Sequence, residues 1–174
     1  MASLQLPGGK LTRLKYDGAI EFGDVPVTAD GLHARAVSAP VKVVAKTADV
    51  SGGLTAPEAD LTDFTLGTLQ VSGDAKLKKG RVEDGGCVGG VLHADECRLK
   101  GELTVGRGSK LARCAADVLK VQLEGTEADG KADVYLVDSD VRTVEYLGRA
   151  GASRCTKSDV GEELNSCKGK RKAK

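Results

Sequence analysis

The stretch that decides the fold is Cys97-Arg98-Leu99-Lys100-Gly101-Glu102-Leu103-Thr104-Val105. It holds two short runs in which apolar and polar residues alternate, and a Lys-Gly pair separates them. Alternation with a period of two turns one face of a β-strand inward and the other toward solvent. Gly interrupts the stretch before an apolar stripe of helical period can run for three turns. The stretch therefore predicts short β-strands.

Similar alternating runs recur along the whole chain. They cover residues 19–22, 32–37, 41–45, 65–71, 119–123, 132–136 and 144–147. Turn-forming triplets or pairs stand between them, at Ser51-Gly52-Gly53, Ser72-Gly73-Asp74, Asp84-Gly85-Gly86 and Asp129-Gly130. The chain is therefore predicted to be all-β.

A six-residue pattern suggests that the strands repeat. It starts with Ala, continues with Asp or Pro, and places small or aliphatic residues at its fourth and sixth positions. Clear copies cover residues 29–34, 56–61, 94–99 and 116–121, and looser copies begin at residues 48, 75 and 137. Neighbouring copies lie 19 to 22 residues apart, which suits one coil of a parallel β-helix or β-solenoid. An antiparallel β-sandwich or barrel is the alternative.

The composition favours a thin, repetitive core. Aromatic residues make up 3% of the chain, Trp is absent, and Phe occurs only at Phe22 and Phe64. The core is therefore expected to consist of Val, Leu and Ala, with Cys and a little Ile. Small aliphatic side chains pack well between closely spaced backbones, where large rings would not fit.

At 174 residues the chain suits a single domain. Residues 1–10 are predicted to be an N-terminal extension or cap, residues 11–155 the solenoid, and residues 156–174 a C-terminal segment with a basic, disordered tail. The tail 168–174 carries five positive charges, and the net charge of the chain is +1, so the rest is acidic.

The cysteines and the apolar runs bear on the compartment. The chain has five cysteines, an odd number, without a closely spaced pair, which favours free thiols in a reducing compartment. Residues 1–10 lack the order of a signal peptide, and no apolar run reaches the roughly 20 residues of a membrane span. We therefore expect no membrane span and an intracellular protein, cytoplasmic or packaged from inside a cell.

Residues Ala94–Gly151 resemble the head-GIN-type adhesin domains and, more distantly, the polymer-forming bactofilins. The resemblance lies in an Ala-Asp-x-Leu-x-Val opening followed by Gly, within Ala116–Gly125, and in Val144-Glu145-Tyr146-Leu147-Gly148. It implies a right-handed parallel β-helix that serves as a scaffold, an adhesin or a filament subunit. The chain departs from the pattern because it lacks an export signal and has few Ser-Gly-x-Gly turns.

The densest acidic stretch is the candidate ligand site. It contains Glu124, Glu127, Asp129, Asp133, Asp138 and Asp140. Glycoside hydrolysis needs two carboxyl groups on either side of the scissile bond, and a β-helix can present such groups on adjacent coils. Asp133 is expected to point outward from its strand, and Asp138 and Asp140 to be turn residues. A solvated acidic edge is the simpler interpretation, so Asp129, Asp133, Asp138 and Asp140 are candidates for binding and none for catalysis.

Other chemistry-bearing groups give weaker patterns. Cys87, His93, Cys97 and Cys114 lack the paired spacing of a zinc site, so no metal and no cofactor are predicted. Cys97 and Cys114 are expected to be small core residues. His33 is expected to be an exposed strand residue, and Gly106–Lys110 a turn, since the order of a phosphate-binding loop is absent.

The basic tail is the second candidate binding segment. Lys170, Arg171 and Lys172 could contact nucleic acid, anionic lipid or an acidic protein. The whole sequence favours a non-enzymatic structural or interaction protein that forms homo-oligomers or binds a protein partner, for example a self-assembling scaffold subunit. The alternatives are a polysaccharide-binding module or a carboxylate-based glycan-active enzyme, and a protein that binds nucleic acid or an acidic partner through its tail.

Overall fold

The computed structural model describes residues 3–123, 133–148, 151–165 and 169–171, and these residues form strands, turns and bends without a helix. In chain order the strands are β1 (Ser3–Leu6), β2 (Gly9–Phe22), β3 (Val27–Ser38), β4 (Val43–Ala45), β5 (Ala48–Ala56), β6 (Ala59–Val71), β7 (Ala75–Val82), β8 (Gly86–Val88), β9 (Val91–Val105), β10 (Gly108–Ala112), β11 (Ala115–Gln122), β12 (Val134–Val137), β13 (Asp140–Leu147), β14 (Ser153–Thr156), β15 (Asp159–Asn165) and β16 (Gly169–Arg171).

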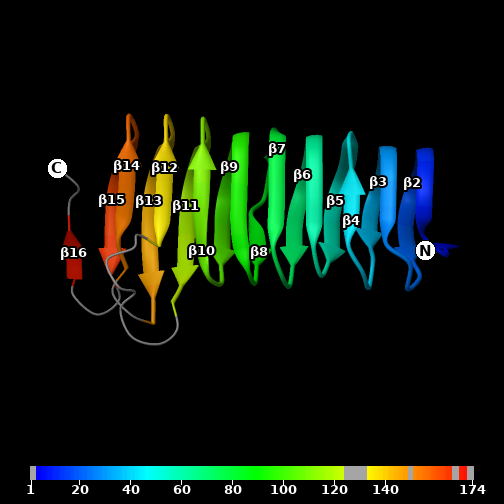
Figure 1. The fold of residues 1–174 in the computed structure, drawn as a ribbon, viewed down its shortest axis with the longest axis horizontal. Coiled ribbons are helices and arrows are strands. Elements are labelled where there is room, and N and C mark those ends of the chain that lie inside the picture. Colours follow the sequence, from blue (N-terminus) through cyan, green and yellow to red (C-terminus); the bar gives the residue numbers. More distant parts are fainter. Residues whose placement is uncertain (1–2, 124–132, 149–150, 166–168, 172–174) are drawn as a thin grey trace.

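These strands wind into a β-solenoid of about nine turns. Figure 1 shows the coils side by side along the longest axis, with the N-terminus at one end and the C-terminus at the other. Neighbouring coils pair in parallel, and within the described residues only β16 runs antiparallel, to β15. The predicted all-β parallel solenoid is confirmed, and the alternative sandwich or barrel is wrong.

Each coil has three sides, as β9 shows most clearly. Its first stretch, 91–95, pairs with β10, and its later stretches, 98–99 and 102–105, pair with two parts of β11 across a register shift. We call the side with 91–95 side A, the side with 98–100 side B and the side with 102–105 side C. Residues in register on successive coils form columns along the axis.

The coil is shorter than the sequence pattern predicted. Gly53 is in register with Thr68 on the next coil, so the chain completes a turn before the predicted repeat is reached. The predicted spacing is therefore wrong for these coils, because the Ala-Asp pairs that define it occur on different sides. Ala94 lies on side A, whereas Ala116 pairs with Leu99 on side B. Small residues are needed at inward positions of every side, so the pattern recurs out of phase.

A left-handed backbone residue marks the corner between sides A and B on six successive coils. These residues have φ between 46° and 55° and are Asp63, Lys79, Glu96, Arg113, Asp138 and Lys157. A single αL residue reverses the side-chain alternation and turns the chain. Asp138 is therefore a turn residue, as predicted, whereas Asp140 begins β13 and is a strand residue.

Two predicted turns have different outcomes. Asp84 and Gly85 do lie between β7 and β8, and at Gly85, with φ of 74°, an added Cβ would lie 2.1 Å from the carbonyl oxygen of Glu102. Glycine is needed there because any side chain would meet the next coil. The turn predicted at Ser51–Gly53 is wrong. These residues lie inside β5, at a register shift where the strand bends from side B to side C.

The core is a continuous column of Val, Leu and Ala, as predicted. Phe22 and Phe64 are both buried, and Tyr146 is the largest fully buried side chain. Cys97 and Cys114 also lie in the core, which confirms their prediction as small core residues. Each inward side chain packs on the same position of the coils above and below, so no coil holds a core of its own.

We expect Leu66→Ala to lower the free energy of unfolding by about 2–5 kcal/mol, because Leu66 is fully buried and the cavity cannot collapse between stacked coils. Its neighbour Thr65 points outward, so Thr65→Ala is the matched control and should change stability by less than about 0.5 kcal/mol. Urea denaturation followed by circular dichroism measures both. Equal effects of the two variants would contradict the assigned inward and outward faces.

Candidate functional site

The structure separates the acidic candidates. Asp129 lies outside the described residues, as do Glu124 and Glu127. Asp133 stands just before β12, where its Oδ2 accepts a hydrogen bond from the Ala152 backbone N–H at 3.1 Å. It therefore ties two neighbouring coils together instead of pointing outward from a strand, as predicted. Asp138 and Asp140 are exposed and lie together at the corner of sides A and B.

Asp138 and Asp140 line a shallow groove of about 910 Å³ on this corner. We call it the corner groove. Its charged lining residues come from four coils and are Lys79, Arg81, Glu96, Arg98, Arg113, Asp138 and Asp140. Coils that lie far apart in sequence thus bring cations beside the two predicted carboxylates.

The groove is hollow because a small residue separates its charged side chains. Arg98 is in register with Ala115, and Ala115 with Asp140, so the arginine and the carboxylate stand two coils apart across an alanine. Two strand spacings amount to about 9.6 Å. A second hollow of about 460 Å³ continues the groove along side B and shares Arg98, Ala115 and Asp140 with it. A ligand could therefore lie along the axis.

The cations of the groove differ in their pairing. Arg113 Nη2 lies 2.5 Å from Asp95 Oδ1 and 3.2 Å from Glu96 Oε1, so neighbouring carboxylates hold it. Within the described part of the chain, Arg98 has no carboxylate within 4.0 Å. An exposed, unpaired guanidinium offers its planar donors to a carboxylate or a phosphate of a ligand.

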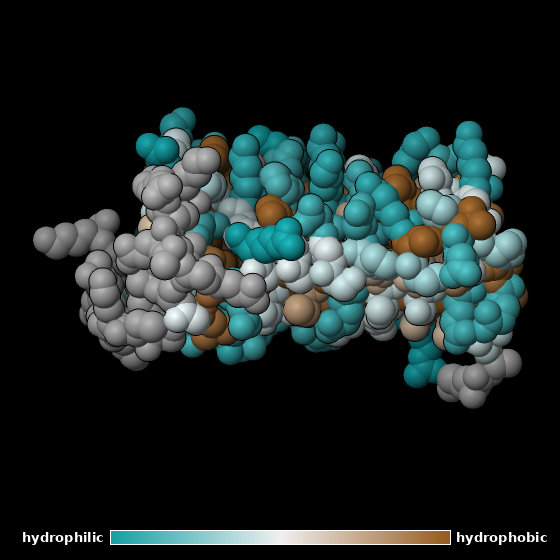
Figure 2. All heavy atoms as spheres, turned by 60° about the horizontal axis from the view of Figure 1, so that its bottom comes forward, coloured by the Kyte–Doolittle hydropathy of each residue, from teal (hydrophilic) through white to brown (hydrophobic). Residues whose placement is uncertain are grey.

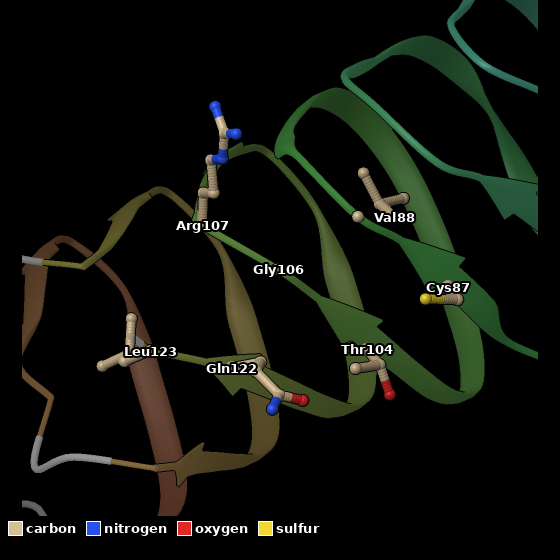
Figure 3. A pocket seen from close by; sticks show the side chains of 8 residues that line it. Cys87, Val88, Thr104, Gly106, Arg107, Gln122 and Leu123 are labelled. Atoms are coloured by element: carbon tan, nitrogen blue, oxygen red, sulfur yellow. The ribbon is translucent and has the colours of Figure 1, made fainter. Parts of the chain in front are cut away.

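A third hollow, of about 510 Å³, lies where side C meets side A. Cys87, Thr104 and Gln122 line it from successive coils, and Leu123 closes one end (Figure 3). Arg107 extends away from the other labelled side chains in this view. The hollow therefore holds one thiol and neutral polar groups, without the paired acid and base that hydrolysis requires among its lining residues.

The cysteines and the nearby histidine are spread over different faces. Cys87 and Thr104 are in register on side C, His93 is exposed on side A, and Cys97 is buried at the corner. Among the described residues no group of three His, Cys, Asp or Glu side chains could hold a metal ion. His33, predicted to be an exposed strand residue, is in β3 with 44% of its side chain exposed, and its Nδ1 lies 3.1 Å from Asp49 Oδ2.

Cys97 and Cys114 belong to a polar ladder inside the corner of sides A and B. We call Cys97, Cys114, Ser139 and Ser158 the corner ladder. The Cys114 N–H donates to Ser139 Oγ and the Ser139 N–H to Ser158 Oγ, both at 3.0 Å. The Cys97 N–H donates to Cys114 Sγ at 3.4 Å. Each side chain thus satisfies a backbone N–H that the turn leaves without a carbonyl partner.

The ladder side chains also donate. Ser139 Oγ donates to the Val137 carbonyl at 2.8 Å, and Cys114 Sγ to the Ala112 carbonyl at 3.1 Å. The hydrogen bond with Cys114, together with burial, raises the pKa of the Cys97 thiol above its ordinary value. Cys97 therefore stays protonated at neutral pH, which suits a structural thiol and not a nucleophile.

The remaining candidates lie in the turns and the tail. Gly106 and Arg107 form a turn, as predicted, but Gly108, Ser109 and Lys110 begin β10. Gly169–Arg171, in the tail predicted to be disordered, form β16 beside β15. Lys170 and Arg171 are thus strand residues, and Lys172 lies outside the described residues.

The sequence reasoning missed the cations of the corner groove. Lys79, Arg98 and Arg113 fall on or beside a corner position that recurs once per coil in this part of the chain. Aligning the chain at the true length of a coil would have brought them together with Asp138 and Asp140. The longer spacing that the sequence pattern predicted placed them on unrelated faces.

Comparisons with protein-family models, with curated proteins and with solved structures gave no match. The residues that the structure describes include no helix that is long and apolar enough to cross a membrane.

We expect Ser139→Ala to lower the free energy of unfolding by about 1–3 kcal/mol, because it leaves the buried Cys114 N–H without an acceptor. Ser109→Ala is the matched control. Ser109 is also a buried serine, but its hydroxyl has no hydrogen-bond partner, so its loss should be neutral or stabilising. Chemical denaturation of the two variants measures the difference, and equal destabilisation would argue against the ladder.

Proposed function

We propose that this chain is a non-enzymatic structural or interaction protein, a rigid rod that forms homo-oligomers or binds a protein partner. The observation that carries the proposal is the uninterrupted parallel stack of coils, whose core continues to the first coil without a covering element among the described residues. A stack of this kind is stiff, since every coil is bonded to its neighbours along its length. Its ends present unpaired strand edges, which are templates for further pairing.

The sides of the rod support the same proposal. Opposite charges face each other one coil apart, as in Lys46 with Asp30 at 2.6 Å and Lys100 with Glu83 at 2.5 Å. Such pairs leave the lateral faces solvated and largely neutral. The face in Figure 2 is accordingly mostly pale or hydrophilic along its middle. Association is therefore favoured at the ends more than at the sides.

An intracellular location is part of this proposal. Four cysteines, Cys87, Cys97, Cys114 and Cys155, are free thiols in the structure. Free thiols persist where the compartment is reducing.

The corner groove favours a second candidate function, the binding of an acidic polysaccharide. Arg98 would pair with a uronate carboxylate, and Asp138 and Asp140 would accept hydrogen bonds from sugar hydroxyls. The groove runs along the axis over several coils, which suits an extended chain better than a compact ligand. The acidic residues then bind and do not catalyse.

We expect the purified chain to associate in a concentration series followed by light scattering and electron microscopy. Regular dimers, larger oligomers or filaments are the predicted species, because unpaired edges and a continuous core favour ordered contacts. A particle that stays monomeric up to millimolar concentration would contradict the proposed scaffold.

For the second candidate, we expect a uronic-acid oligosaccharide to bind with an affinity that Arg98→Ala weakens at least about tenfold, since a charge-assisted bidentate contact is lost. Lys10→Ala removes an exposed cation of the first coil, far from the groove, and serves as the control. Titration calorimetry measures both variants. No binding to the unmodified chain would remove this candidate.

A further inference from the structure

We propose that the N-terminal end of the solenoid is a self-association surface, at which two copies of this chain pair about a two-fold axis. The inference rests on the proposed function and names its partner and its geometry.

The first coil carries apolar side chains that no described residue covers. Leu4, Leu6, Leu11, Leu14 and Tyr16 point inward and pack on the core, yet each is only partly buried. We call them the N-terminal plate. Their register partners on the second coil are Ile20, Phe22, Ala29, Leu32 and Ala34, which are exposed by 5% or less. The difference in exposure marks the place of a missing layer.

The backbone of the same coil has an open edge. Residues 9–16 of β2 pair with β3 on one side and with no strand on the other, within the described part of the chain, and β1 pairs only with β2. An open edge with an apolar inner face is what an added strand needs. Figure 2 shows hydrophobic surface near this end, close to the grey first residues.

The opposite end of the solenoid is built differently. The last coil places Ser153, Cys155 and Glu163 in register with the inward residues Val134, Leu136 and Val144 of the coil before it. These polar groups have partners: Ser153 Oγ lies 2.6 Å from the Tyr146 hydroxyl and 3.5 Å from Glu163 Oε1. In addition, β16 crosses antiparallel to the edge of β15. The C-terminal end is therefore polar and partly closed.

This difference between the ends decides which copy fits. A head-to-tail contact would lay the N-terminal plate on hydroxyl and carboxylate groups and would bury them away from water. A second N-terminal plate buries apolar surface on both sides instead. Such an interface is isologous and closes at two copies, so it gives a dimer and not a filament.

The spiral of the coil makes this end self-complementary. Because β1 lies outside β2 on side C, the end has a step of one strand spacing, about 4.8 Å, where side B meets side C. A two-fold axis through side A turns side B of one copy toward side C of the other. Each β1 then fills the step beside residues 13–16 of the other copy, while residues 9–12 of the two copies meet antiparallel.

The charges of the first coil set the salt dependence. Lys10, Arg13 and Lys15 are exposed along the open edge, so a symmetric pair brings cations together. Salt screens this repulsion, and the dimer should tighten as ionic strength rises. In a head-to-tail contact Lys15 would approach Asp159, which ends the column that Lys15 begins, and salt should weaken that pairing.

The test combines three measurements on the full chain. Small-angle X-ray scattering across concentration should show a dimer about twice as long as the monomer. Leu11→Lys should weaken it at least about tenfold. Cys155→Lys places the same charge at the exposed inward position of the other end and should leave the dimer unchanged. Circular dichroism checks that both variants are folded.

Hydrogen exchange of the unmodified chain makes the test independent of any variant. On dimerisation the amides of residues 9–16 should gain protection, and those of β14 should not. A dimer or filament that survives Leu11→Lys, or that protects β14, overturns this inference and leaves the scaffold proposal standing. A chain that is monomeric at all concentrations overturns both.

Discussion

The structure depends on one constraint: each coil must lie in parallel register on the next, with its backbone groups bonded to both neighbours. Gly80, for example, pairs with Phe64 on one side and Cys97 on the other. At this spacing an inward side chain can use only the width of one strand. That is why the core consists of Val, Leu and Ala, and why its few larger side chains stand beside small ones in the same column, as Phe64 does beside Gly80 and Ala48.

The same register governs polar groups. A residue on the surface meets its counterpart one coil away, so interacting side chains are close in space and far apart in sequence. Lys120 lies 2.7 Å from Glu102 on one side and 3.6 Å from Glu145 on the other, and hydrogen bonding to Glu102 raises the pKa of its ammonium group. Inside the corner, Ser139 links Cys114 to Ser158 in the same way. Columns, and not loops, therefore carry the chemistry of this chain.

Much of the fold could be predicted from alternation alone. The run from Glu102 to Val105 has the polar and apolar order of a strand with one face buried, and the structure has it so. The coil length could not be found in this way. Inward Ala occurs on all three sides, as Ala94 and Ala116 show for two of them, so a local pattern does not fix the phase. The corner groove was missed for the same reason, because Arg98 and Asp140 meet only when the phase is correct.

The two ends follow from the constraint as well, because a stack of coils has no natural last layer. A terminal coil must either make its inward positions polar or leave apolar surface open. Ser153 and Glu163 take the first course at one end, where the hydroxyl of the buried Tyr146 is satisfied by Ser153. Leu11 and Leu14 take the second at the other. An apolar end is stable in water only when something covers it, and the surface of the same shape that is always available is the end of another copy.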